Sequence, residues 1–165
     1  MEIIEKARYL AITAHAGQSY GKDIHVPYIK HLEDVVKVLN EFGIVDDNLI
    51  IAGYLHDIIE DTFATYSDLK KSTNEIIAEY TFALTNEKGR NRVDRANDKY
   101  YKELKEYKHG SFIKLCDRIA NVKYSKNINP EMFKMYKKEY KNFKEKLYDG
   151  RWNPMWKELE KLIKE

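Results

Sequence analysis

Apolar residues recur at helical spacing along almost the whole chain. In the first run, from Ile3 to Ala14, they return every three or four residues, which is typical of a helix with one buried face. The same spacing predicts helices over residues 29–39, 46–60 and 111–123. These runs make an all-α fold the expected architecture.

Capping motifs mark further helix starts between these runs. Thr65 has an aspartate three residues later, and Ser72 has a glutamate three residues later. This is the spacing of a capping box, in which two polar side chains satisfy free backbone N–H groups. A more polar helix is expected over residues 89–107.

Two asparagine–proline pairs open the last two helices. Asn129-Pro130 and Asn153-Pro154 each place a good N-cap residue before a proline, which is favoured in the first helical turn. Residues 17–27 form a polar loop. Because no internal repeat, low-complexity tract or linker interrupts the chain, we expect a single domain over residues 1–165, with roughly eight to ten helices.

Composition agrees with a helical globular domain. Of the 165 residues, 43% are hydrophobic and 34% are charged, which excludes an intrinsically disordered chain. The chain has only 7 glycines and 3 prolines, too few for the many turns of a large antiparallel sheet.

Charge and cysteine content restrict the partners and the environment. A formal net charge of +2 is too small to indicate nucleic-acid binding, and the lysine-rich residues 134–146 have the pattern of an ordinary amphipathic helix. The single cysteine, Cys116, excludes a disulfide framework and is expected to be a buried, inert thiol. Because neither a secretory signal pattern nor an apolar span of about 20 residues is present, we expect a cytoplasmic protein without membrane partners.

Ionisable side chains interrupt an apolar helix at one place, within residues 50–62. Four of them fall within six positions: His56, Asp57, Glu60 and Asp61. Burying a carboxylate without a partner costs several kcal/mol, so this pattern needs a compensating charge. A divalent cation is the natural one, and an imidazole with a carboxylate suits Mn²⁺, Fe²⁺ or Zn²⁺ better than Ca²⁺.

Helical spacing divides these four groups into two pairs. His56 and Asp57 each have an acidic residue four positions later, one turn further along the same face. The first two are therefore candidate metal ligands, and Glu60 and Asp61 candidate groups for orienting water or substrate. The alternative interpretation is a partly exposed helix end whose acids cap or solvate the last turn.

Two residues do not complete a coordination sphere, so further ligands are needed. His31 begins the predicted second helix, and Asp117 and Asn121 share one face of the helix over residues 111–123. Spacing alone does not connect these residues to His56.

Four sequence blocks resemble a known family. They are Ala14–Gln18, Val26–His31, Leu55–Thr62 and Lys114–Asn121. Their order and content resemble the HD superfamily of metal-dependent phosphohydrolases. They are most similar to the hydrolase domain of Rel/SpoT proteins and to the small alarmone hydrolases typified by the metazoan SpoT homologue. The resemblance covers about residues 3–147.

The resemblance implies an HD-domain helical bundle that binds one Mn²⁺ ion and removes the 3′-pyrophosphate of (p)ppGpp, giving GDP or GTP and pyrophosphate. It implies that the metal ligands are His31, His56, Asp57 and Asp117. By the same resemblance, Glu60 and Asp61 are the catalytic acids and Asn121 contacts the nucleoside.

The chain departs from the family pattern where the substrate phosphates are expected. The family usually has an arginine before the Pro-Tyr-Ile-x-His block, whereas here the candidate cation in that loop is Lys22, a point charge without bidentate geometry. Tyr136 stands roughly where the family places an aromatic residue beside the base. Further candidate phosphate contacts are Arg90, Arg92 and Arg95.

These departures leave two alternatives to a (p)ppGpp hydrolase. One is an HD-type phosphatase that acts on a nucleoside monophosphate, NADPH or an adenosine alarmone. The other is a nucleotide-binding module or antitoxin. The sequence leaves open whether the protein is a homo-oligomer, and it assigns His15 no role.

Overall fold

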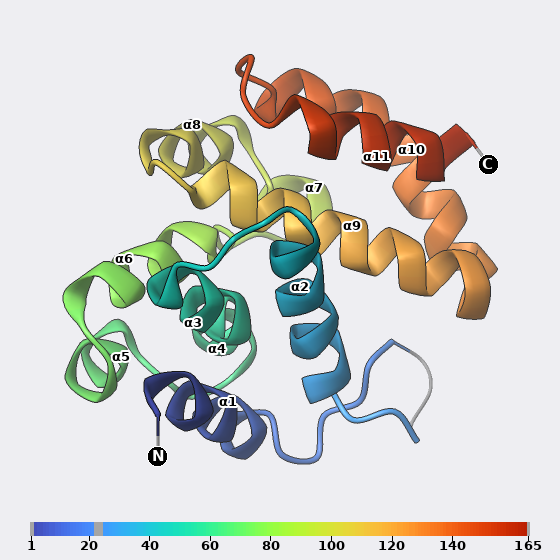
Figure 1. Ribbon diagram of the computed structural model, residues 1–165. Helices are drawn as coiled ribbons and strands as arrows, with labels where there is room; N and C mark the ends of the chain where they lie inside the picture. Colours follow the sequence, from blue (N-terminus) through green and yellow to red (C-terminus); the bar gives the residue numbers. More distant parts are fainter. Residues whose placement is uncertain (1, 22–24, 165) are drawn as a thin grey trace.

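In the computed structural model, which describes residues 2–21 and 25–164, the chain forms helices joined by loops (Figure 1). Pairing of β type within these residues is limited to one isolated bridge, between Ser19 and Pro27. The helices are α1 (Ile3–Ala14), α2 (Ile29–Glu41), α3 (Asp47–Leu55), α4 (Ile58–Asp61), α5 (Tyr66–Ser72), α6 (Glu75–Leu84), α7 (Arg92–Arg95), α8 (Asp98–Glu106), α9 (Gly110–Ile128), α10 (Pro130–Leu147) and α11 (Asn153–Lys164). The expected all-α fold is confirmed.

Helix α9 runs through the middle of the molecule (Figure 1). It packs against α2 on one side and against α10 and α11 on the other. Its apolar residues, among them Ile113, Leu115 and Ile119, belong to the larger of two buried clusters. Because α9 touches both halves of the bundle, a side chain on its surface can meet residues from either half.

A second buried cluster lies under α1, α3, α5 and α6, on the N-terminal side of the fold. Leu32 of α2 and Leu55 of α3 are fully buried in it. Helices α2 and α3 therefore contribute to both clusters and join them.

A glycine sets the close approach of α2 to α3. A Cβ atom on Gly53 would lie 2.5 Å from Leu39 Cδ1 and 3.3 Å from Val36 Cγ2, closer than side-chain atoms normally come. The missing side chain lets the two helices pack tightly, which brings the start of α2 near the end of α3.

The predicted helix over residues 46–60 is wrong in one respect, because it breaks at His56 and Asp57. Helix α3 ends at Leu55, and α4 begins at Ile58 after a turn in which Asp57 has φ −98° and ψ −2°. The His56 imidazole Nδ1 contacts the Gly53 carbonyl oxygen at 2.9 Å. Asp57 still accepts the backbone N–H of Asp61, so the two aspartates stay one turn apart.

Other helix boundaries differ for local reasons. The helix expected over residues 89–107 is two helices, α7 and α8. The first ends at Arg95 with Ala96 as its C-cap, and Asn97 caps the second by accepting from Tyr100 N–H. The expected start at Ser72 is wrong, since Asn74 caps α6. The capping box at Thr65 and the cap at Asn129 are confirmed.

Across the described ranges 2–21 and 25–164, none of the helices combines the length and apolar character that crossing a bilayer requires.

Candidate metal centre and active site

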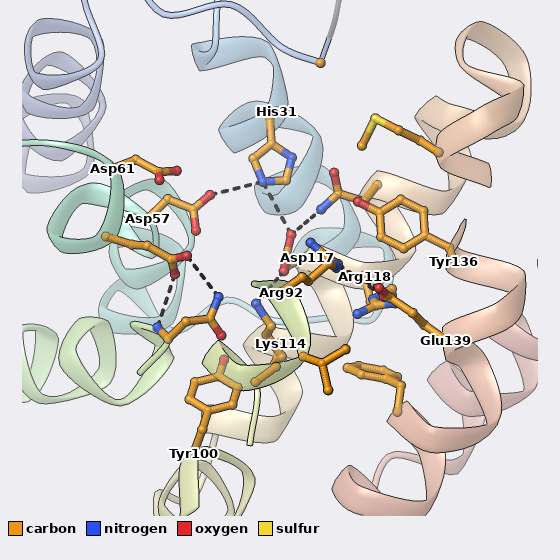
Figure 2. Close-up of a pocket in the computed structure, with 18 of the residues that line it drawn as sticks. His31, Asp57, Asp61, Arg92, Tyr100, Lys114, Asp117, Arg118, Tyr136 and Glu139 are labelled. Atoms are coloured by element: carbon orange, nitrogen blue, oxygen red, sulfur yellow. Dashed lines mark hydrogen bonds and ion pairs between the residues drawn. The ribbon is translucent and has the colours of Figure 1, made fainter. Parts of the chain in front are cut away.

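Three buried side chains from three parts of the chain meet at one point. His31 comes from the first turn of α2, His56 from the turn after α3, and Asp117 from the middle of α9. Each offers one possible ligand atom, and these atoms all lie within 4.8 Å of one another. Figure 2 shows His31 and Asp117 facing each other, with Asp57 beside them.

The two imidazoles face the two carboxylates through their Nε2 atoms. His31 Nε2 lies 3.4 Å from both Asp57 Oδ2 and Asp117 Oδ1. His56 Nε2 lies 3.0 Å from Asp57 Oδ2, 3.9 Å from Asp117 Oδ1 and 3.3 Å from His31 Nε2. We call these four residues the histidine wall.

Burial opposes charge on every member of the histidine wall, but attraction between its members, and from Lys114 to Asp117, outweighs burial. Although burial lowers the pKa of His31, hydrogen bonds to Asp117 and Asp57 raise that pKa to about 9. The pKa of His56 is also raised against burial, chiefly by the charge of Asp57. Lys114 and the two imidazoles hold the pKa of Asp117 far below its usual range despite burial. The two carboxylates of the histidine wall thus require positive charge beside them.

The donor set fits a divalent transition ion. Two imidazole nitrogens with two carboxylates are the ligands that Mn²⁺, Fe²⁺ or Zn²⁺ accept. Since a carbonyl oxygen can only accept, the contact of His56 Nδ1 with Gly53 O makes Nδ1 the protonated nitrogen. That bond orients the ring and leaves Nε2 as the ligand atom, an arrangement common among metal-binding histidines.

The two candidate catalytic acids flank this wall on α4. Glu60 accepts hydrogen bonds from the backbone N–H of Asn86 at 3.2 Å and from its side-chain amide at 2.9 Å. The hydroxyl of Tyr28 donates to Asp57 Oδ2 at 2.6 Å and also lies 3.4 Å from Asp61 Oδ2. Burial, and then the charges of Asp57 and Glu60, raise the pKa of Asp61 to about 6.

Three members of the histidine wall, His31, Asp57 and Asp117, and both acids line a cavity of about 270 Å³, and His56 lies behind them. The opposite side of the cavity consists of Arg92 from α7, Arg118 from α9, and Tyr136 and Glu139 from α10, which we call the arginine wall (Figure 2). Both arginines bind the Glu139 carboxylate: Arg92 Nε at 2.7 Å and Arg118 Nη1 at 2.9 Å. The guanidinium carbons of Arg118 and Arg92 lie 4.8 and 5.6 Å from the Tyr136 ring centre.

The structure brings together some of the predicted substrate contacts and not others. Asn121, Arg92 and Tyr136 line the cavity, and Asn121 also donates to Asp117. Arg90 is exposed and is not among the described residues that line it. Lys22 lies outside the described residues. Arg95 Nη1 lies 3.7 Å from Glu60 Oε1, beside a candidate catalytic acid.

Sequence reasoning missed several residues of the cavity, among them Tyr28, Lys114, Arg118 and Glu139. Lys114 Nζ pairs with Asp117 Oδ2 at 2.9 Å, and a lysine on the apolar face of a predicted helix was the available signal. Tyr28 belongs to the Val26–His31 block, but nothing in the sequence indicated that its hydroxyl contacts Asp57 and Asp61. The role of Arg118 depends on Glu139, 21 positions later on another helix, and no local pattern joins the two.

Comparison with known proteins finds a family and relatives similar to this chain. A model of the HD domain family matches residues 7–143. The guanosine-3′,5′-bis(diphosphate) 3′-pyrophosphohydrolase MESH1 of Drosophila melanogaster is 26% identical over 123 residues, which cover 74% of this chain and 68% of that protein. The guanosine-3′,5′-bis(diphosphate) 3′-pyrophosphohydrolase of Aquifex aeolicus is 32% identical over 126 residues, which cover 74% of this chain and 18% of that longer protein.

A solved structure of a metazoan ortholog of SpoT, described as hydrolysing ppGpp, has the same arrangement of helices. It superposes with a TM-score of 0.84 at 22% sequence identity, covering 99% of this chain and 95% of that one. At this level of identity the likeness shows a shared fold.

Proposed function

This chain belongs to the HD domain family, and from that premise we propose that it hydrolyses the 3′-pyrophosphate of (p)ppGpp, giving GDP or GTP and pyrophosphate. The observation that carries the proposal is the convergence of His31, His56 and Asp117 beside a cavity that arginines line on the other side. The names of the two relatives support the same reaction.

We propose that the histidine wall holds one Mn²⁺ ion, through His31, His56, Asp57 and Asp117. A divalent metal follows from the family and from the donor set, and manganese is the more specific proposal. When bound, the ion would supply a Lewis acid that offsets phosphate charge and lowers the pKa of water.

Glu60 and Asp61 would orient the attacking water and move its proton. The water oxygen forms a bond to the phosphorus next to the 3′-oxygen, and the bond between that phosphorus and the 3′-oxygen breaks. One proton leaves the water, and the 3′-oxygen takes up one proton. A carboxyl whose pKa is about 6, as burial makes it for Asp61, can accept and return a proton near neutral pH.

The arginine wall would bind the rest of the nucleotide. The Tyr136 ring offers an aromatic surface for a base, and Asn121 a side-chain amide for the nucleoside. Arg92, the more exposed of the two arginines, can reach a phosphate by exchanging part of its contact with Glu139. Lys22 and Arg90 remain proposals from the sequence.

The test is pyrophosphate release from ppGpp by the purified protein with Mn²⁺, with EDTA and a His56→Ala variant as controls. Release that disappears in both controls would support the reaction, its metal dependence and the site. Absence of release in the presence of stoichiometric bound metal would contradict the proposed substrate, and nucleoside monophosphates, NADPH and adenosine alarmones would be assayed next.

We further propose that the protein works in the cytoplasm, where a nucleotide substrate is available, and that it needs no nucleic-acid partner. Sedimentation of the purified protein would show whether it is a homo-oligomer.

A further inference from the structure

The segment between α1 and α2 contains two side chains that contact the catalytic acid Asp61 and a third that contacts both of them. They are, in this order, Gln18, Tyr28 and His15. None of them is a proposed metal ligand, catalytic acid or substrate contact. His15 and Gln18 belong to the Ala14–Gln18 block, for which the proposed reaction has no use.

Tyr28 connects the ligand carboxylate to the catalytic carboxylate. Its hydroxyl donates to Asp57 Oδ2 at 2.6 Å and lies within 3.4 Å of Asp61 Oδ2. Two carboxylates one helical turn apart repel each other, and a shared hydroxyl offsets that repulsion and sets their separation.

Gln18 holds the backbone of Asp61. Its Nε2 donates to the Asp61 carbonyl oxygen at 2.7 Å, and its Oε1 contacts His15 Nδ1 at 2.8 Å. Because the carbonyl can only accept, the Gln18 amide must point its NH₂ at Asp61 and its oxygen at His15. His15 Nδ1 must then be the protonated nitrogen, and burial lowers the pKa of this ring and keeps it neutral.

His15 joins the two contacts into one unit. Its ring stacks on the Tyr28 ring, with centroids 4.7 Å apart and planes inclined by 24°. Backbone bonds connect Tyr28 N–H to the Gln18 carbonyl at 3.1 Å and Gln18 N–H to the His15 carbonyl at 3.0 Å. The three side chains thus restrain Asp61 at its main chain through Gln18 and at its carboxylate through Tyr28.

We propose that His15, Gln18 and Tyr28 are positioning residues that hold the Asp61 carboxylate beside Asp57 for the reaction. The proposal rests on the proposed function, in which Asp61 is a catalytic acid. It assigns a role to three side chains of the loop between α1 and α2 that the proposed reaction leaves without one.

Two nearly isosteric variants test it. Gln18→Glu keeps the acceptor for His15 but has no N–H for the Asp61 carbonyl, so kcat should fall about tenfold or more while KM and the Kd for Mn²⁺ stay within about threefold. Tyr28→Phe keeps the stack on His15 and loses the hydroxyl. It should lower kcat by about tenfold to a hundredfold and also weaken Mn²⁺ binding, because Asp57 loses a donor.

Tyr107→Phe is the matched control, since that hydroxyl also donates to a carboxylate, Glu79, but outside this cavity. It should leave kcat and the Kd for Mn²⁺ unchanged. An unchanged kcat in Gln18→Glu would overturn the proposal. A fall of kcat in Gln18→Glu that accompanies equal losses of thermal stability and metal affinity would also overturn it, because it would indicate general structural damage.

Crystal structures of the wild type and both variants separate this proposal from the proposed function. If the wild-type protein hydrolyses no nucleotide, the proposed function fails, but the structures still test the positioning. A shift of the Asp61 carboxylate by about 1 Å or more in Gln18→Glu would support the proposal, since a misplacement of that size is costly in catalysis. An unmoved carboxylate would contradict it.

Discussion

The two walls of the cavity handle their charges in opposite ways. In the arginine wall the Glu139 carboxylate bonds with both Arg92 and Arg118 and so offsets one of their two positive charges. The histidine wall gathers two carboxylates around two imidazoles, and burial opposes the charge of all four groups.

This difference indicates what each wall is built to bind. A buried cluster of acids and imidazoles gains from an added cation, whereas a wall of paired arginines admits an anion only by exchanging existing contacts. Changes in the histidine wall should therefore eliminate chemistry, and changes in the arginine wall should weaken substrate binding.

The largest effect is expected from removing a ligand of the histidine wall. His56→Ala should lower kcat/KM by about a thousandfold or more, since a metal ion contributes several kcal/mol and each 1.36 kcal/mol is worth tenfold in rate. EDTA should do the same to the wild type. His109→Ala, a histidine that contacts Tyr80 away from the cavity, is the control.

Scanning calorimetry with and without Mn²⁺ tests whether His56 also contributes to metal binding. When the free Mn²⁺ concentration is a hundred times its Kd, binding stabilises the native state by about 2.7 kcal/mol. The wild type should therefore melt at a higher temperature with Mn²⁺ than with EDTA. His56→Ala should lose that difference. A variant that still binds Mn²⁺ tightly and keeps most of its activity would refute the assignment of the ligands.

The next effect separates chemistry from metal binding within the same region. Glu60→Gln should lower kcat by about a hundredfold or more, the usual range for loss of a general acid or base, with Mn²⁺ affinity nearly unchanged. Glu79→Gln is a matched control, because Glu79 also accepts two hydrogen bonds, from Tyr66 and Tyr107, outside the cavity. A full kcat in Glu60→Gln would leave Asp61 as the sole catalytic acid.

The two walls also differ in how far the sequence predicts them. The histidine wall was predictable because His56 and Asp57 are adjacent and their charge contrasts with the apolar residues before them. Family resemblance added His31 and Asp117. The break between α3 and α4 was not predictable, because residues with a helical pattern flank it on both sides. The contact of the His56 imidazole with the Gly53 carbonyl depends on the folded backbone and leaves no signal in the sequence.

The arginine wall depends on contacts between helices distant in sequence. Arg92 reaches Glu139 across 47 positions, and nothing in the local pattern of either segment indicates that they meet. The division between α7 and α8 comes from Asn97, whose capping role competes with the helical pattern around it. Arg90 and Arg92 look equivalent in sequence. Of these two arginines, both among the described residues, Arg92 lines the cavity and Arg90 does not.

That pair of arginines gives the third prediction. Arg92→Met should raise KM about tenfold with little change in kcat, because one hydrogen bond to a charged group contributes about 1.5 kcal/mol. Arg90→Met should raise KM less, since Arg90 is exposed away from the cavity lining. Steady-state kinetics on both variants test it, and an equal or larger effect at Arg90 would favour the sequence-based alignment over the present geometry.

The smallest effect is a pH dependence of stability from the arginine wall. Burial alone would raise the pKa of Glu139, but Arg92 and Arg118 together hold it below its ordinary value of 4.5. A carboxyl with a lowered folded-state pKa stabilises the protein above its unfolded pKa, and this stability is lost as pH falls through the folded value.

Glu139→Gln should therefore melt a few degrees below the wild type at pH 7, and the gap should narrow below about pH 4.5. The other groups that take up protons on acidification are common to both proteins and cancel in the difference. A gap that stays constant or widens on acidification would mean that Glu139 contributes through packing, and the arginine wall would not be held together by charge.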